Sequence, residues 1–135
     1  MLGYLRYLSY IYPVNKLIIK IKVMSKFVST RNKGFFMEFE NGFGVSVQYG
    51  IENYCEKKNT TIHPTNPMEH TRWDSLSAEI AVFEGERMLS VSTDGVDAVI
   101  GWLGTDDVAK IISIVQSAHP DNEEEMVEKI KSLNL

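Results

Sequence analysis

The chain has 135 residues, with 14 Lys and Arg against 18 Asp and Glu, which gives a formal net charge of -4. An apolar content of 44% and a charged content of 24% are ordinary for a soluble globular protein, and they exclude collagen-like and fully disordered chains. The single cysteine excludes an internal disulfide framework and a multi-cysteine zinc site. Such cysteine usage is typical of a reducing compartment, so we expect a cytoplasmic protein.

The charge is unevenly distributed along the chain. The first 23 residues carry four basic side chains and no acid: Arg6, Lys16, Lys20 and Lys22. The rest of the chain therefore holds 10 basic and 18 acidic side chains, a net charge of -8. Because binding to a phosphate backbone needs clustered Lys and Arg, nucleic acid is not expected as a partner.

The N-terminal segment 1–23 is apolar, but Arg6, Pro13 and three lysines interrupt it, so we expect no membrane span and no secretory signal. Three interpretations stay open: a basic amphipathic surface anchor, an extra edge strand at Lys16–Val23, or an extension upstream of a biological start at Met24. We favour the third. The expected organisation is an extension at 1–23 and a single α+β domain at 24–135.

The segment 34–49 predicts a β-hairpin, because Asn41-Gly42 separates two strand-like runs. A two-residue loop would mix polar and apolar side chains on both faces. A three-residue loop ending at Gly42 instead places Met37 opposite Val45 and gathers the apolar side chains on one face. We therefore expect the three-residue loop, with Gly42 in the left-handed conformation that it requires.

The segment 77–103 predicts a three-stranded meander with turns at Gly85-Glu86 and Asp94-Gly95. These turns set Val82 opposite Leu89, and Leu89 in turn opposite Ile100, which gives all three strands one shared apolar face. The members of that expected face are Ala78, Ile80, Val82, Leu89, Val91, Val96, Ala98 and Ile100.

Two helices follow the meander. The Thr105 hydroxyl is the expected cap of the first, whose apolar stripe runs from Val108 to Val115 and which ends before Pro120. The second begins near Asn122 with three glutamates in its first turn. The sequence thus predicts an α+β fold: an antiparallel sheet of about five strands with the C-terminal helices packed on one face.

A long segment without periodicity, 52–75, is the most promising region for a site, since loops of this length are usually functional or disordered. The ligand-binding candidates here and at nearby strand ends are aromatic, amide and cationic: Tyr49, Asn53, Tyr54, Arg72, Trp73 and Trp102. Arg72 would supply a fixed positive charge for an anion. The structural alternative is that Tyr49 and Trp102 finish core strands and Trp73 pins the loop.

Chemistry at Cys55, His70 and Glu79 is a secondary hypothesis. Cys55 with His63 or His70 has the composition of a nucleophile and base, but a half-buried cysteine at a strand end explains it as well. Glu79 could work as an acid or base with His70 or Asp74, or lie as a plain carboxylate on a solvated face. With no four-ligand metal pattern and no catalytic signature, we assign no metal, no cofactor and no catalytic residue.

From Met24 onward the chain resembles a set of small, mostly uncharacterised proteins encoded by bacteriophages and some bacteria. The resemblance is carried by Phe39-Glu40-Asn41-Gly42, by Ser46-Val47-Gln48 through Asn53-Tyr54-Cys55, by Ala78-Glu79-Ile80-Ala81, and by Gly101-Trp102-Leu103 before the helix start at Thr105. The resemblance implies that a phage or bacterial genome encodes the protein and that the protein is located in the host cytoplasm. It assigns a catalytic role to no residue.

We therefore expect a non-catalytic, phage-type accessory protein that engages a host protein or sequesters a small ligand, with a nucleotide as one candidate. A protein-binding module should expose an apolar patch, whereas a nucleotide pocket should gather Arg72 or other cations. One alternative is a small hydrolase or nucleotide-modifying enzyme that uses His70, Asp74 and Glu79 within hydrogen-bonding reach of one another. Another is a homo-oligomer that associates through Phe36 and the outer hairpin face.

Overall fold

The computed structural model describes residues 13–14, 17–18, 25–60 and 72–135. Near the N-terminus, β1 (Pro13–Val14) and β2 (Leu17–Ile18) pair as a small antiparallel sheet of their own. Only β2 falls within the strand considered at Lys16–Val23. The remainder of that strand lies outside the described residues.

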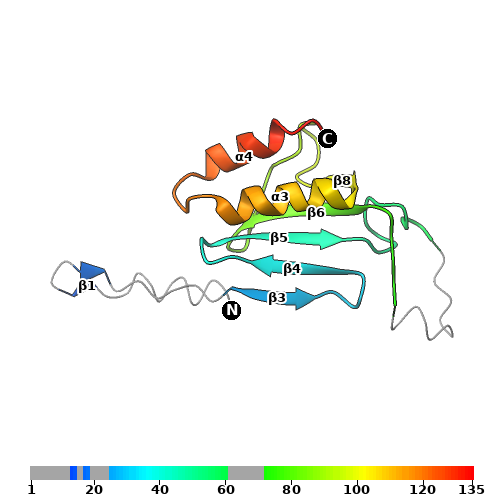
Figure 1. Cartoon of the computed structure of the whole chain (residues 1–135), viewed down its shortest axis with the longest axis horizontal. Helices are drawn as coiled ribbons and strands as arrows, with labels where there is room; N and C mark the ends of the chain where they lie inside the picture. Colours follow the sequence, from blue (N-terminus) through cyan, green and yellow to red (C-terminus); the bar gives the residue numbers. More distant parts are fainter. Residues whose placement is uncertain (1–12, 15–16, 19–24, 61–71) are drawn as a thin grey trace.

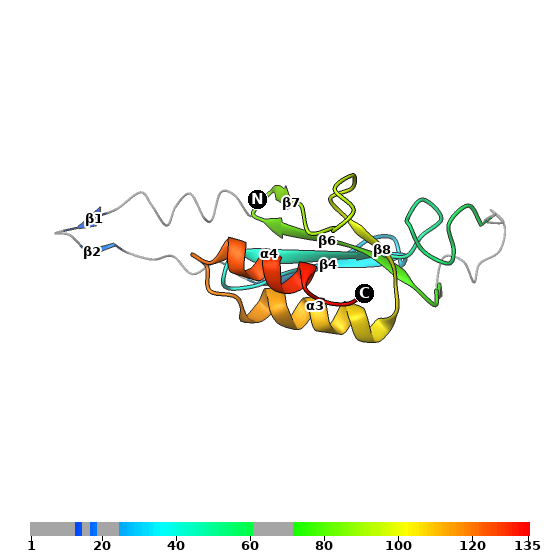
Figure 2. The same cartoon turned by 90° about the horizontal axis from the view of Figure 1, so that it is seen from above.

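The main sheet has six strands, all antiparallel, in the order β3-β4-β5-β6-β7, with β8 also paired to β6. Its strands are β3 (Lys26–Ser29), β4 (Gly34–Glu38), β5 (Phe43–Gln48), β6 (Ala78–Glu84), β7 (Arg87–Leu89) and β8 (Ile100–Leu103). The helices α3 (Thr105–Ser117) and α4 (Glu123–Lys131) follow. Helix α3 lies over one face of the sheet, and α4 lies beside α3 on the β6 side (Figures 1 and 2). The predicted α+β class is confirmed.

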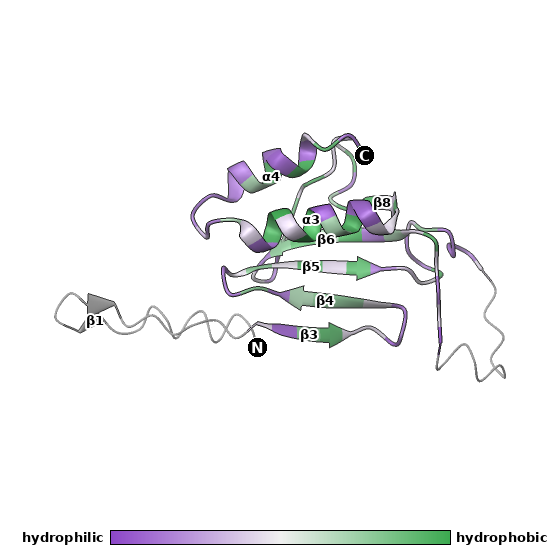
Figure 3. Cartoon of the chain, in the orientation of Figure 1, coloured by the Kyte–Doolittle hydropathy of each residue, from purple (hydrophilic) through white to green (hydrophobic). Residues whose placement is uncertain are grey.

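The core lies between the sheet and the helices. Helix α3 packs over β5 and β6, and α4 packs against α3. Figure 3 shows hydrophobic residues along β6 and in stripes on α3. The largest fully buried side chains are Phe43, Ile80, Ile111, Met126 and Ile130. They come from two strands and both helices, so the apolar stripes of the sequence meet in this layer.

The hairpin of β4 and β5 has the predicted register. Phe35 pairs with Val47 and Met37 pairs with Val45. Gly42 has a φ of +91°, the left-handed conformation that the three-residue loop requires. The alternation of apolar side chains therefore determined the pairing, because a slip by one residue would have moved all of them to the other face.

The strand β3 was not predicted, and it explains why the sheet has six strands instead of five. Lys26–Ser29 pairs with β4 through a tight turn in which Arg31 and Asn32 both have positive φ angles, 46° and 56°. A turn with two left-handed residues usually carries Asn-Gly or Gly-Gly. Arg-Asn gives no such signal in the sequence.

Of the predicted meander, the first turn is confirmed and the second strand pairing is not. Val82 does pair with Leu89. However, β8 pairs with β6 through Ile80 and Ile100, so the expected pairing of Leu89 with Ile100 is wrong. The strand β7 has only three residues, and the chain then leaves the sheet.

The expected second turn of the meander is part of a polar loop. The Asp94 carboxylate accepts hydrogen bonds from the backbone N–H groups of Val96 and Asp97 at 2.8 and 3.1 Å. Such local bonds compete with a strand ladder. Val96 is consequently 86% exposed and does not belong to the core face, whereas Val91 still bonds the Ala98 carbonyl through its N–H.

The helix starts differ in how well they were predicted. Gly104 is the N-cap of α3, so Thr105 is its first helical residue and not its cap, and no side chain caps this end. Asn122 is the N-cap of α4, as expected, and three glutamates form its first turn. Among the residues that the structure describes, no helix is long and apolar enough to cross a membrane.

Candidate functional site

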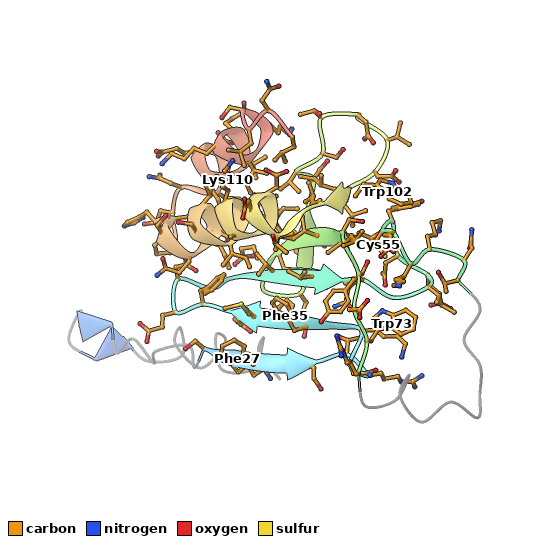
Figure 4. All side chains as sticks on the ribbon, turned by 45° about the vertical axis from the view of Figure 1, so that its right-hand side comes forward. Phe27, Phe35, Cys55, Trp73, Trp102 and Lys110 are labelled. Carbon is orange, nitrogen blue, oxygen red and sulfur yellow. The ribbon has the colours of Figure 1, made fainter. Side chains whose placement is uncertain are left out.

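The structure divides the predicted ligand-binding residues between two places. Tyr49 and Trp73 line a cleft beside α3, whereas Tyr54 and Trp102 lie together elsewhere on the surface. Figure 4 shows Trp73 near Phe35 on one side of Cys55, and Trp102 on the other. The six residues therefore do not form one pocket.

The cleft has a volume of about 460 Å³, within the range of ligand pockets, roughly 300–1,000 Å³. One side is formed by strand residues from β4 and β5 and the other by the first half of α3. Segment 73–77, which leads into β6, completes it. The main lining residues are Phe35, Val47, Tyr49, Trp73, Val108, Ala109 and Ile112.

Trp73 both fixes and lines this cleft. Its indole N–H donates a hydrogen bond of 2.8 Å to the Tyr49 carbonyl, which ties segment 73–77 to the end of β5. The Lys33 ammonium lies 4.8 Å from the centre of the Trp73 ring, a cation–π distance. The structural role predicted for Trp73 is therefore present, and its ring still forms a wall of the cleft.

The charged groups near the cleft are mostly acidic, although Lys33 lies over the Trp73 ring that forms one wall. Asp74 is the charged residue of its lining, and Asp106 and Asp107 occupy the first turn of α3 nearby. Arg72 is exposed outside the lining, with its guanidinium 3.8 Å from the Asp74 carboxylate. Among the described residues, none of those lining the cleft is cationic, so the convergence that an anionic ligand needs is missing there.

Glu79 anchors the irregular segment that follows β5. One carboxylate oxygen accepts a hydrogen bond from the Asn53 amide at 3.3 Å, and the other accepts one from the Tyr54 backbone N–H at 3.0 Å. The Asn53 side-chain oxygen in turn accepts from the Gly50 N–H at 2.9 Å. These contacts use Asn53 and Glu79 to hold the backbone, and they place neither side chain in the cleft.

Trp102 is strained and exposed. The register of β8 shifts between its pairs with Ala78 and Ile80, which is the irregularity of a β-bulge. Within it, Trp102 has a φ of +59°, and its side chain is 60% exposed. The alternative in which Trp102 finishes a core strand is therefore wrong, because the bulge turns its ring to solvent.

Tyr54 lies directly against this bulge. The Trp102 N–H donates to the Tyr54 carbonyl at 2.8 Å. A Cβ on Gly101 would come within 2.5 Å of the Tyr54 Cβ, so only glycine fits at that position. The Lys58 ammonium covers the Tyr54 ring at 4.8 Å. Tyr54 and Trp102, which this backbone hydrogen bond joins and which are both exposed, are a second aromatic patch apart from the cleft.

Cys55 is a buried structural residue, but it lies beyond the end of β5 and is not the half-buried residue at a strand end that the sequence suggested. Its side chain is fully buried, and its thiol donates to the Gly50 carbonyl at 3.4 Å. His63 and His70 lie outside the described residues. Within the part of the chain that is described, no three His, Cys, Asp or Glu side chains cluster as metal ligands would.

The acid–base candidates are not brought together in the described structure. Asp74 lies 3.8 Å from the Lys57 ammonium and from the Arg72 guanidinium, whereas Glu79 binds Asn53 and Tyr54. Their contacts have no residue in common. Since His70 is outside the described residues, its role in the enzyme hypothesis stays a prediction.

The outer face of the hairpin, considered above for oligomer formation, is partly occupied by its own aromatic residues. Phe36 and Phe83 meet edge to face at a centroid distance of 5.7 Å. They meet across β5 because Gly44 lies between them; a Cβ there would come within 2.7 Å of the Phe36 ring. Phe36 is half-buried as a result.

The sequence did not predict the helix side of the cleft. Val108 and Ile112 belong to the apolar stripe of α3, and a stripe gives no sign of where packing leaves a gap. Only Ala109 could have indicated the cleft in advance, because a small residue beside this stripe leaves room next to the sheet. Comparison with protein-family models, with curated proteins and with solved structures finds no match to this chain.

Proposed function

We propose that this chain is a non-catalytic binding protein whose cleft receives an uncharged apolar or aromatic group, supplied by a side chain of a partner protein. The observation that carries the proposal is the cleft of about 460 Å³ with Phe35, Tyr49 and Trp73 in its lining. Aromatic walls supply a large contact area at little conformational cost, as in protein-binding hot spots.

The surroundings of the cleft favour a protein partner over a nucleotide. Leu76, at the rim, is strongly exposed and extends the apolar lining outward. Asp74 and the acidic first turn of α3 oppose a phosphate group, and the Arg72 guanidinium is paired with the Asp74 carboxylate. The resemblance to phage-encoded proteins makes a host protein the partner that we propose.

The proposal is tested with two matched probes in protein-detected NMR. The first, p-cresol, is the uncharged side chain of tyrosine, and p-cresyl phosphate adds a phosphate to the same ring. We expect p-cresol to shift the amide resonances of Tyr49, Ala109 and Ile112, and the phosphate to shift them less. Tighter binding of the phosphate would instead favour a nucleotide-type ligand, and shifts confined to Tyr54 and Trp102 would move the site to the other aromatic patch.

A further inference from the structure

The two edges of the main sheet differ. On the β6 side, the edge is divided between the short strands β7 and β8, and Arg87 of β7 forms an ion pair with Glu123 of α4. On the other side, β3 is the last strand, and no described strand pairs with its outer edge. Figure 1 shows β3 at the edge, away from both helices.

The direction of the β3 backbone groups follows from one hydrogen bond. The Thr30 N–H donates to the Gly34 carbonyl at 3.0 Å, so Thr30 faces β4. Antiparallel pairs alternate between bonded and non-bonded positions along a strand. The N–H and C=O groups of Lys26 and Val28 therefore face β4, and those of Phe27 and Ser29 face outward, where they are available to another strand.

The side chains of β3 are apolar on both faces and exposed. Phe27 is 79% exposed on the face that carries the helices, and Val28 is 42% exposed on the opposite face. Natural proteins usually protect a sheet edge with proline, a bulge or inward-pointing charges. This strand has only Lys26, at its first position.

From this edge we propose that a second copy of the chain pairs with β3, antiparallel, about a twofold axis at Phe27. A continuous sheet requires that opposed residues point to the same face, so that Phe27 opposes Phe27 of the partner or Val28 opposes Val28. Both arrangements use the outward backbone groups, because Phe27 bonds Phe27 in the first and Ser29 in the second. We propose the first, because it brings together the two most exposed apolar side chains of the strand.

The strand is complementary to itself in this register. Phe27 meets its own copy on the helix-bearing face, which forms an aromatic cross-strand pair. On the other face, Lys26 opposes Val28, so no like charges meet and the lysine stem covers the valine. Ser25 opposes Ser29 at each end. This complementarity favours a second copy over an unrelated peptide.

The dimer has a consequence for the cleft. An axis perpendicular to the sheet leaves the faces unchanged, so both α3 helices and both clefts lie on the same side of one continuous sheet. Phe35, in the cleft, is paired with Ser29 of β3. The two binding sites therefore flank the new strand pair.

Sedimentation velocity of the full chain at low and high micromolar concentration tests this inference. We expect a dimer that F27K weakens at least about tenfold, because it places two like charges in contact on the axis. The matched control is V96K, which alters an equally exposed apolar residue in the 90–99 loop and should leave the dimer unchanged. A monomer at every concentration, or a dimer indifferent to F27K, would overturn the proposal.

Cross-linking tests the register without relying on stability. Opposed residues in a bonded antiparallel pair have Cα atoms about 5.5 Å apart, which a disulfide can span. F27C should therefore form a covalent dimer under mild oxidation, while V96C and the parent chain, whose Cys55 is buried, should not. Equal cross-linking of F27C and V96C would show random collision and would contradict the pairing.

Discussion

The Asn41 side chain joins the hairpin turn to the end of a helix. Its amide nitrogen lies 2.8, 3.1 and 2.9 Å from the carbonyl oxygens of Val115, Gln116 and Ala118. Its side-chain oxygen accepts from the Phe43 N–H at 3.0 Å. The last carbonyls of a helix lack partners within the helix, so Asn41 satisfies groups at the end of α3 while it shapes the β4–β5 turn.

Replacement of Asn41 should therefore destabilise the fold far more than replacement of an ordinary turn residue. We expect N41A to lower the free energy of unfolding by roughly 2 kcal/mol, since several helix-end carbonyls lose their donor. N41D should cost at least as much at neutral pH, because a carboxylate cannot donate to these carbonyls and is repelled by the helix C-terminus.

Urea denaturation followed by circular dichroism measures both effects. The control is N59D, because Asn59 is exposed and has a φ of 62°, a left-handed conformation that aspartate also adopts. This change should alter the free energy of unfolding by less than about 0.5 kcal/mol. If N41A and N59D proved equally mild, the amide contacts to α3 would not contribute to stability.

At the scale of the elements, the irregular segments on either side of the undescribed loop support each other through Glu56. Its carboxylate accepts hydrogen bonds from the Leu76 N–H at 3.0 Å and the Ser75 hydroxyl at 3.4 Å. Its own N–H donates to the Ser77 hydroxyl at 2.8 Å. Because segment 73–77 forms one wall of the cleft, these bonds position that wall.

The same bonds predict a pH dependence. The hydrogen bond from the Leu76 amide, with smaller contributions from Lys57 and Ser75, lowers the pKa of Glu56 below its ordinary value. A carboxylate with a lowered pKa in the folded state stabilises the fold above its unfolded pKa, about 4.3, and loses this effect as the pH falls through its folded pKa.

We therefore expect E56Q to be less stable than the parent chain at pH 7, with the difference shrinking as the pH falls below about 4. Urea denaturation over this pH range measures the difference. E52Q, in the same segment, is the control and should show no such narrowing. A stability gap for E56Q that stayed constant with pH would show that the charge of Glu56 is not involved.

The sequence predicts an element correctly where its residue pattern allows only one strand pairing or one helix position. The β4–β5 hairpin was predicted to the residue, because Gly42 and the alternation around Met37 and Val45 allow only one register. The position of β8 was wrong, because the Asp94 turn bonds its own backbone and ends the meander early. The strand β3 was missed, because its turn at Arg31 and Asn32 lacks the residues that usually signal one.

The sequence predicted only those parts of the site that a local pattern reveals. Trp73 and Tyr49 stood out as large side chains near an irregular segment, and both line the cleft. The separation of Trp102 from them follows from a bulge in β8, which no local pattern reveals. The helix wall of the cleft arises from how α3 is placed over β5, and only the assembled fold determines that.

In the whole molecule, an apolar cleft lies beside α3, and β3 forms the edge of the main sheet among the described strands. Paired through that edge, two copies would present two clefts on one side, which suits a partner that carries two sites or is itself a dimer. The proposed function depends on the cleft, whereas the strand pairing depends on separate contacts at β3.

A p-cresol titration of two α3 variants by NMR tests whether this cleft is the binding site. A109W should fill the cleft from its helix wall and weaken p-cresol binding at least about tenfold. S113W adds the same side chain to an exposed position of α3 that does not line the cleft, and it should bind p-cresol as the parent chain does. Unchanged p-cresol binding in A109W, or equal loss in both variants, would contradict the assignment of this cleft as the binding site.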